Sequence, residues 1–216
     1  PQGRPLTARL DVGPLSQSSL SRLKEHYLGA RILVTSVDAD VLESGALHEA
    51  PTQQPSKRLQ SIIDAGKVGL PLTTGLMVGI GESSESRQKA LTVLKRVALE
   101  YGHLQNVLIQ SFHPHPATPM ASAAPTSLNA MLDTVEMARQ ILPPSVRVQI
   151  NALDWMDYLD ELVEAGVQDL GDLNLRILKK KDADHDLQLS MVFERLRTKG
   201  YTLRPRAALL PLRGYV

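Results

Sequence analysis

One stretch of the sequence, residues 70–91, combines residue types that could contact a ligand. It reads LPLTTGLMVGIGESSESRQKAL, an apolar run with two glycines around Ile80, followed by Glu82 and a polar helix start. Such a run predicts a β-strand, and a glycine inside a strand usually means that something approaches the backbone closely. A structural interpretation also exists, in which Gly75 and Gly79 relieve packing and Glu82 sits at a helix N-terminus. The stretch alone leaves both interpretations open.

Two histidines in the segment SFHPHPATPM are candidates for metal binding. His113 and His115 lie two residues apart, so in an extended chain both imidazoles face the same side. No third ligand is evident in the sequence, and the alternating prolines favour a rigid loop over residues 113–125. We therefore predict no metal site in this chain.

Other common catalytic arrangements are missing from the sequence. The chain contains no cysteine, which excludes disulfides, thiolate metal ligands and a cysteine nucleophile. There is no Gly-x-Ser-x-Gly elbow, and no glycine-rich loop ends in Gly-Lys-Ser or Gly-Lys-Thr. The catalytic residues are therefore unknown from the sequence.

Composition narrows the class of protein. The 216 residues are 43% hydrophobic, and 24 Lys and Arg balance 23 Asp and Glu, so we expect a globular protein that binds no nucleic acid. No apolar run approaches the roughly 20 residues of a membrane helix, and no signal peptide is recognisable. We expect no membrane association, and a cytoplasmic location or an organelle stroma. The chain opens with PQGRPL and lacks an initial methionine, so we interpret it as a piece of a longer protein.

The elements that must position these residues alternate between short apolar runs and stretches of helical period. We expect strands at 8–15, 30–37, 70–80, 104–112, 146–150 and 167–173, and helices at 16–27, 55–69, 84–102, 126–142, 155–166 and 185–200. This alternation is typical of a parallel sheet. No Gly-x-Gly-x-x-Gly turn follows a strand, so we favour a (β/α) barrel over a doubly wound sheet.

Three segments together resemble a known family. They are PSKRLQSIIDAGKVGLPLTTGLMVGIGES, YGHLQNVLIQSFHPHPATPM and LVEAGVQDLGDL. In order and spacing they resemble the radical S-adenosylmethionine enzymes, most closely the deazaflavin (FO) synthase subunit, from about Gly13 to Leu210. The resemblance implies an incomplete (β/α) TIM-type barrel of about six βα units, with the first two missing. We expect residues 1–216 to form one partial barrel domain, with 201–216 as an extended tail.

The resemblance also implies which residues bind ligands. A Gly-x-Ile-x-Gly-x-x-Glu pattern of the family lies against the adenine of S-adenosylmethionine, and Met77 stands here in place of its isoleucine. A strand end opened by glycine would let backbone groups meet the adenine edge. The implied cofactor-binding residues are Thr74, Gly75, Met77, Gly79 and Glu82, and the implied substrate-binding residues are Gln110, Ser111 and His113.

The family's reaction is implied in the same way. A reduced 4Fe-4S cluster held by three cysteines cleaves S-adenosylmethionine, and the resulting radical abstracts hydrogen from an adduct of tyrosine origin with ribityl-diaminouracil. Ring closure with loss of ammonia then gives the deazaflavin precursor of coenzyme F420. The partners implied are the small-molecule substrate, a sister radical S-adenosylmethionine subunit that makes the adduct, and an electron donor.

This sequence departs from the family at several sites. It lacks the Cys-x-x-x-Cys-x-x-Cys loop that follows the first barrel strand, so it holds no cluster ligands. The family's glutamate on the fourth strand is replaced by Thr35 or Ser36, its arginine after the sixth strand is replaced within SFHPHP, and its Trp-Gly-Gly reads LGDL. Losing polar anchors weakens substrate recognition.

The sequence therefore predicts the C-terminal part of a lyase similar to FO synthase, inactive as an isolated chain. Two alternatives remain open. One is a degenerate, non-catalytic binding or scaffold subunit of the same family, and the other is a β/α-barrel enzyme for small molecules without radical chemistry. A barrel that lacks two strands also leaves open edges, which predicts low stability or pairing with another chain.

Overall fold

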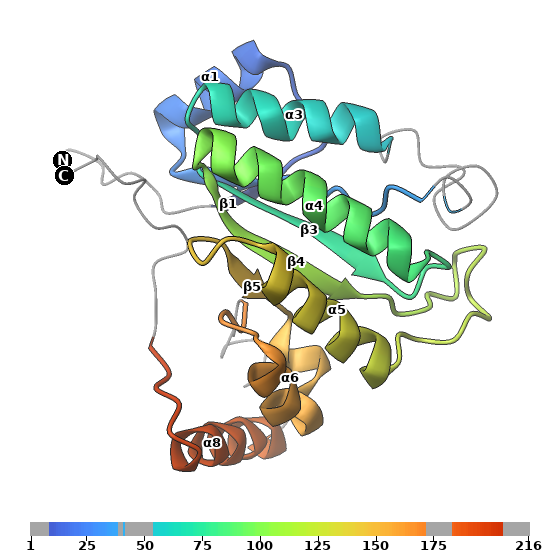
Figure 1. Cartoon of the computed structure of the whole chain (residues 1–216). Helices are drawn as coiled ribbons and strands as arrows, with labels where there is room; N and C mark the ends of the chain where they lie inside the picture. The colour runs from blue at the N-terminus through green and yellow to red at the C-terminus, as the bar shows by residue number, and fades with distance from the viewer. Residues whose placement is uncertain (1–8, 39–40, 42–53, 172–182, 205–216) are drawn as a thin grey trace.

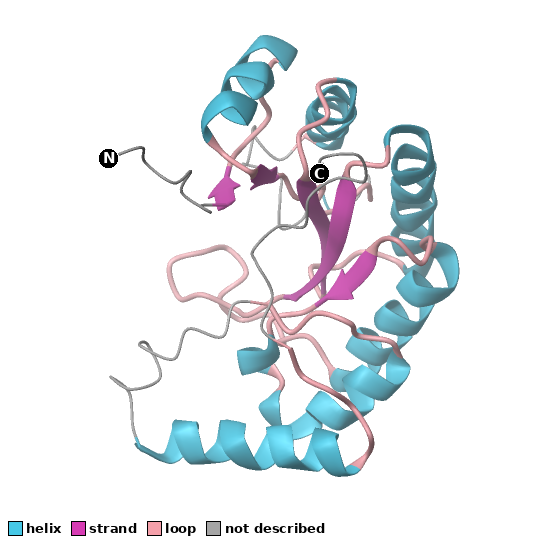
Figure 2. Cartoon of the chain, turned by 90° about the vertical axis from the view of Figure 1, so that its left-hand side faces the viewer, coloured by secondary structure: helices cyan, strands magenta, loops and turns pink. Residues whose placement is uncertain are grey.

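The computed structural model describes residues 9–38, 41, 54–171 and 183–204. Its centre is a parallel five-stranded sheet whose strands lie in chain order. The strands are β1 (Arg9–Asp11), β2 (Gly29–Arg31), β3 (Leu72–Val78), β4 (Leu104–Ser111) and β5 (Arg147–Gln149). Helices lie between successive strands and form an arc outside the sheet (Figure 2). This arrangement is a partial (β/α) barrel, as the sequence predicts.

Except for α6, the helices begin and end close to their predicted limits. They are α1 (Gln17–His26), α3 (Pro55–Lys67), α4 (Ser84–Tyr101), α5 (Leu128–Ile141), α6 (Leu159–Ala165) and α8 (Ala183–Thr198) (Figure 1). Pro55 occupies the first turn of α3, and Gly102 ends α4 in a left-handed conformation with φ 65°. The Ser83 hydroxyl accepts a hydrogen bond from the Ser86 backbone N–H and so caps α4.

The main core lies between the sheet and the helices. Leu72, Leu76 and Val78 alternate along β3 toward this layer, where Leu91 and Leu94 of α4 are fully buried. Each fully buried leucine contributes about 1.5–3 kcal/mol relative to an exposed one. The opposite face of β3, which carries Met77, lines the inside of the partial barrel. Every residue of β3 except the half-buried Met77 is buried, because both faces of the strand are covered.

The predicted strand 30–37 is interrupted. Ordered pairing of β2 ends at Arg31, and the chain returns to β3 in one isolated bridge between Thr35 and Leu76. Ile32 donates to the Thr73 carbonyl and Thr35 to the Gly75 carbonyl, so three residue steps on this strand match two on β3. This extra residue is a β-bulge, and it places Thr35 at φ 70°. A β-branched residue in that region is strained.

The last units also differ from the sequence prediction. In place of one helix over 155–166, two short 3₁₀ turns, η2 (Ala152–Asp154) and η3 (Met156–Tyr158), precede α6. The predicted strand 167–173 is reduced, among its described residues, to one parallel bridge between Gln149 and Asp169. Residues 172–173 of that strand and 205–216 of the predicted tail lie outside the described residues, so the single-domain and tail assignments stay predictions.

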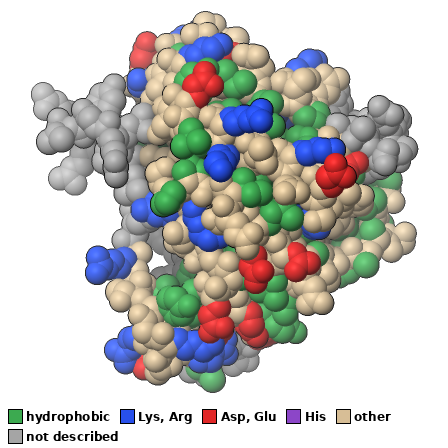
Figure 3. All heavy atoms as spheres, in the orientation of Figure 1, with side chains coloured by type: hydrophobic (Ala, Val, Ile, Leu, Met, Phe, Trp, Pro, Cys, Tyr) green, Lys and Arg blue, Asp and Glu red, His purple; other side chains and the backbone are tan. Residues whose placement is uncertain are grey.

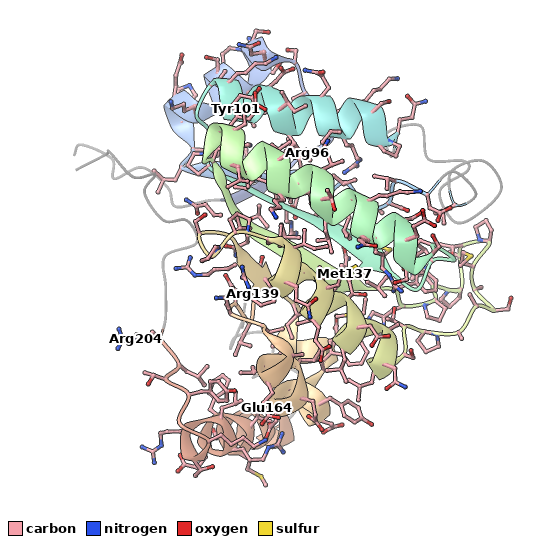
Figure 4. All side chains as sticks on the ribbon, viewed as in Figure 1. Arg96, Tyr101, Met137, Arg139, Glu164 and Arg204 are labelled. Carbon is pink, nitrogen blue, oxygen red and sulfur yellow. The ribbon has the colours of Figure 1, made fainter. Side chains whose placement is uncertain are left out.

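The connection from α5 to β5 is fixed by one arginine. Arg139 lies near the end of α5 (Figure 4), and its guanidinium donates to the carbonyl oxygens of Leu142, Pro143 and Val146 at 2.8–3.0 Å. The loop after the helix therefore keeps partners for its carbonyl groups. Gly166 packs against this side chain, since a Cβ there would lie 2.9 Å from the Arg139 Cβ.

Candidate active site at the carboxyl ends of the strands

The turn after β3 is held by the carboxylate of Glu82. This carboxylate accepts hydrogen bonds from the backbone N–H groups of Gly79, at 3.1 and 3.2 Å, and of Ile80, at 2.9 Å. Arg87 of α4 donates to the same carboxylate at 3.3 Å, and only 3% of the Glu82 side chain is exposed. The predicted cofactor residue Glu82 therefore shapes the turn through contacts within the chain.

The glycines of β3 have packing reasons. A Cβ at Gly75 would lie 2.2 Å from the Leu108 carbonyl oxygen of β4, and one at Gly79 would lie 2.6 Å from the Thr126 Oγ1. Gly79 also adopts φ 94°. A packing contact therefore accounts for each glycine, and the expectation that they let backbone groups meet an adenine edge stays a prediction. Open space does occur beside Gly81, where a Cβ would meet no atom within 4 Å.

The predicted residues Thr74 and Met77 lie on different faces of β3. Thr74 is fully buried in phase with Leu72 and Leu76, on the side that faces the helices. Its Oγ1 has no hydrogen-bond partner. Met77 lies on the opposite face of the strand and lines a cavity inside the partial barrel. The structure thus separates these two members of the predicted cofactor set.

The cavity occupies the inner side of the sheet and has a volume of about 380 Å³. Its lining residues come from the first four strands, from the segments that follow β1 and β2, and from α3. They are Asp11, Val12, Gly13, Arg31, Leu33, Thr35, Arg58, Met77, Leu108 and Gln110. Arg31 and Asp11 form an ion pair across β1 and β2. The volume is that of a small-molecule site, and of the predicted residues it brings together Met77 and Gln110.

A second polar group lies at the carboxyl end of β4. The Ser111 hydroxyl donates to the Asp154 Oδ2 at 3.3 Å and lies 3.1 Å from the His113 Nε2. That imidazole nitrogen is 3.4 Å from the Asp154 Oδ2, which also accepts from the Asn151 amide at 2.9 Å. The two predicted substrate residues Ser111 and His113 are therefore neighbours, and 56% of the His113 side chain is exposed.

Sequence reasoning missed Asp154. It follows β5 and directly precedes the predicted helix WMDYLDELVEAG, and no motif marks it. The signal that could have found it is its position after a strand, because the carboxyl ends of parallel strands meet at one edge of the sheet. Gln110 is separated from this group, since it lines the cavity on the opposite face of β4 from Ser111.

His115 does not join His113 in a metal site. Its Nδ1 accepts a hydrogen bond from the Ala117 backbone N–H at 3.2 Å, and its carbonyl oxygen accepts one from the Thr118 hydroxyl at 2.8 Å. Within the described parts of the chain, no group of three or more His, Cys, Asp or Glu residues is arranged to hold a metal ion. The proline-rich segment is a turn-forming loop, as the sequence indicates.

One face of the molecule carries charged side chains of both signs (Figure 3). On the face shown in Figure 3, Lys and Arg side chains are interspersed with Asp and Glu. Among the helices that the structure describes, none combines the length and the apolar character needed to cross a membrane.

Comparison with solved structures supports the fold described above. Methylornithine synthase (PylB) matches with a TM-score of 0.66 at 16% sequence identity, covering 91% of this chain and 58% of that one. HydG, a maturase of the [FeFe]-hydrogenase, matches with a TM-score of 0.65 at 12% identity, covering 74% of this chain and 36% of that one. At such identities the likeness shows the fold. The chain therefore has the fold of an incomplete (β/α) barrel.

Comparison with curated sequences is more specific. The 7,8-didemethyl-8-hydroxy-5-deazariboflavin synthase of Methanococcoides burtonii is 38% identical over 171 residues, covering 78% of this chain and 49% of that protein. The same enzyme of Synechocystis is 32% identical over 204 residues, covering 93% of this chain and 64% of that protein. No protein-family model matches the chain. The chain is a radical S-adenosylmethionine protein of the FO synthase type, and it spans about half to two thirds of these relatives.

Proposed function

We propose that this chain is the C-terminal part of an enzyme that forms the deazaflavin ring of the coenzyme F420 precursor. The substrate would be an adduct of tyrosine origin with ribityl-diaminouracil, and ring closure would release ammonia in a lyase reaction. The observation that carries the proposal is the 38% identity to a 7,8-didemethyl-8-hydroxy-5-deazariboflavin synthase over most of the chain. The cavity on the inner face of the sheet supports it, because its volume suits a small molecule.

The residues present fit the two cofactors of this class unequally. S-adenosylmethionine, which supplies the deoxyadenosyl group in this chemistry, would lie at the end of β3, where Met77 lines the cavity and space is open beside Gly81. The role of Glu82 would be to fix the turn that carries Gly79 and Ile80. A 4Fe-4S cluster does not fit, because the 216 residues include no cysteine. We therefore propose that the isolated chain has no turnover.

On the substrate side, the chain's own residues would bind and orient. Gln110 can donate and accept hydrogen bonds within the cavity. The Ser111, His113 and Asp154 group at the end of β4 would contact the part of the substrate at the mouth of the barrel and could move a proton there. A sister subunit that makes the adduct and an electron donor would be the partners, in the cytoplasm or an organelle stroma.

One observation favours a second candidate function. The missing cysteines, together with Thr35 or Ser36 at the family's glutamate position, suit a degenerate binding or scaffold subunit. The gene sequence upstream of the codon for Pro1 separates the two candidates. A reading frame that continues into Cys-x-x-x-Cys-x-x-Cys supports the enzyme, and a start codon directly before Pro1 supports the binding subunit.

The decisive measurement is the formation of 5′-deoxyadenosine. The protein including any upstream residues is reconstituted anaerobically with iron and sulfide, then given S-adenosylmethionine and a reductant. We expect 5′-deoxyadenosine from that protein and none from the 216-residue chain treated in the same way. The absence of 5′-deoxyadenosine from a longer protein that does carry the cysteine motif would overturn the radical assignment.

A further inference from the structure

A buried polar cluster lies inside the partial barrel, below the cavity. Asn106 of β4 is 1% exposed, Gln149 of β5 is 2% exposed, and Asp169 after α6 is 8% exposed. Asn106 alternates with Leu108 and Gln110, which line the cavity, and Gln149 pairs in register with Leu108. The cluster therefore shares the inner face of the sheet with the cavity.

The Asp169 carboxylate fixes the orientation of both amides. Its Oδ2 accepts from the Asn106 Nδ2 at 2.6 Å, and its Oδ1 accepts from the Gln149 Nε2 at 3.2 Å and from the Gly171 backbone N–H at 2.9 Å. A carboxylate can only accept, so each amide must turn its NH₂ group toward Asp169. Each amide oxygen is then directed away from that carboxylate.

Both amide oxygens lack a partner. The Asn106 Oδ1 and the Gln149 Oε1 are buried, and neither has a hydrogen-bond partner among the residues that the structure describes. An unpaired buried acceptor is destabilising, so two in one cluster call for a donor group. Exchanging the oxygen and nitrogen positions of either amide would place its oxygen against the Asp169 carboxylate, which cannot donate. Flipping the amides therefore leaves their oxygens without a donor.

We propose that Asn106, Gln149 and Asp169 form a subsite for an amino or ammonium group of the small-molecule substrate. The two amide oxygens would accept N–H donors, and the nearby carboxylate would favour a positive charge. An anionic group would lie beside the Asp169 carboxylate and would be disfavoured by like-charge repulsion. For the identity of the substrate this inference rests on the proposed function, whereas the preference for an amine follows from the cluster itself.

Nuclear magnetic resonance of the ¹⁵N-labelled 216-residue chain tests the subsite. The side-chain NH₂ signals of Asn106 and Gln149 are assigned and followed during titration with ribityl-diaminouracil and, separately, with ethanolamine. We expect these signals to shift with at least one probe. We expect Asn106→Leu and Gln149→Leu each to weaken the binding of that probe at least tenfold. Thr134→Val is the control, because it removes a buried hydroxyl on α5 that donates to the Ala130 carbonyl, away from the cluster.

The outcomes separate this inference from the proposed function. The subsite is supported if a probe binds and the two leucine variants weaken its binding. If ribityl-diaminouracil is such a probe, with or without ethanolamine, the result also agrees with the proposed function. If only ethanolamine binds in this way, the result counts against the proposed substrate. The subsite is overturned if neither probe shifts the amide signals, or if both variants bind with wild-type affinity. If a variant does not fold, the wild-type signals alone decide.

Discussion

Arg58, on helix α3, donates a hydrogen bond of 2.6 Å to the backbone carbonyl of Leu33. The backbone hydrogen bond from the Val12 N–H to the Arg31 carbonyl lies at the end of the pairing between β1 and β2. Leu33 lies just beyond that point. The guanidinium thus supplies the donor at a carbonyl next to the bulge at Thr35. Burial lowers the pKa of Arg58, but the group stays charged at any ordinary pH.

Replacing Arg58 with methionine should destabilise the chain by about 2 kcal/mol, because a partly buried carbonyl loses a charged donor. Urea unfolding monitored by circular dichroism measures the change. The neighbouring exposed Lys57 provides the control, and Lys57→Met should change the free energy of unfolding by less than about 0.5 kcal/mol. Equal effects of the two variants would show that the contact with Leu33 does not stabilise the strand.

Glu82→Gln should cost about 2 kcal/mol of stability. The new NH₂ group would replace one carboxylate oxygen and would face another donor, either the backbone N–H groups of Gly79 and Ile80 or the Arg87 guanidinium. Chemical denaturation measures this loss. Glu85→Gln removes a carboxylate of the same helix start whose ion pair with Lys89 is exposed, and it should be nearly neutral. A Glu82→Gln variant as stable as Glu85→Gln would contradict the turn-fixing role.

The fully buried His103 should make stability depend on pH. Burial lowers its pKa from 6.5 to about 4, outweighing the opposing effect of its hydrogen bond with the Ile62 carbonyl. Between these values the unfolded chain binds more protons than the folded one, so stability is complete above pH 6.5 and falls as the pH drops toward 4. The loss across this window should be about 3 kcal/mol.

Unfolding at pH 7 and pH 5 tests the assignment to His103. The variant His103→Leu should lose most of the difference between the two pH values, even if it is less stable at pH 7. His26→Gln, at an exposed position on α1, should keep the wild-type difference. If His103→Leu retains the full pH dependence, other groups cause it.

Helix α8 is joined to α6 by a charged contact. The Arg195 guanidinium donates to the Asp160 carboxylate at 2.8–3.2 Å, and Lys199 lies 3.1 Å from the same carboxylate. Although burial by itself raises the pKa of Asp160, hydrogen bonds from both cations lower it overall. We expect Asp160→Asn to reduce the protection of α8 against hydrogen exchange and to cost about 1 kcal/mol, since Arg195 is half exposed. Glu194→Gln, which affects only the exposed pair with Arg197, should leave the protection of α8 unchanged.

A functional prediction concerns Asp154 in the complete enzyme. Asp154→Asn removes the charge beside His113 and Ser111, and it should lower turnover roughly tenfold and shift the pH profile of the rate. The exposed Asp157, three residues further on, gives the control variant Asp157→Asn, which should behave like the wild type. If both variants have the wild-type profile, the group at the end of β4 has no part in proton movement.

Much of the fold could be predicted because its signals are local. Pro55 and Gly102 mark helix ends, and the apolar run over 70–80 marks a strand wherever it lies in the molecule. The bulge at Thr35 could not be predicted, because it exists only in the register between that strand and β3.

The site was less predictable because its members converge only in three dimensions. Asn106, Gln149 and Asp169 come from three successive units of the barrel, and no spacing in the sequence relates them. The glycines were noticed correctly, but the atoms that require them, at Leu108 and Thr126, lie on other segments of the chain. Sequence patterns show where a backbone must come close to something, whereas the partner is set by the tertiary fold.

The chain-order sheet also has a consequence for the way the molecule opens. Pairing between β3 and β4 extends along the whole of β3, from Leu72 opposite Leu104 to Val78 opposite Ser111. The outer strands pair over only a few residues. Local unfolding should therefore spread inward from both margins, with β1 and the Asp169 bridge opening first and the central pair last. A ligand of the Asn106, Gln149 and Asp169 cluster could then enter where the bridge between Gln149 and Asp169 opens, while the centre of the sheet stays folded.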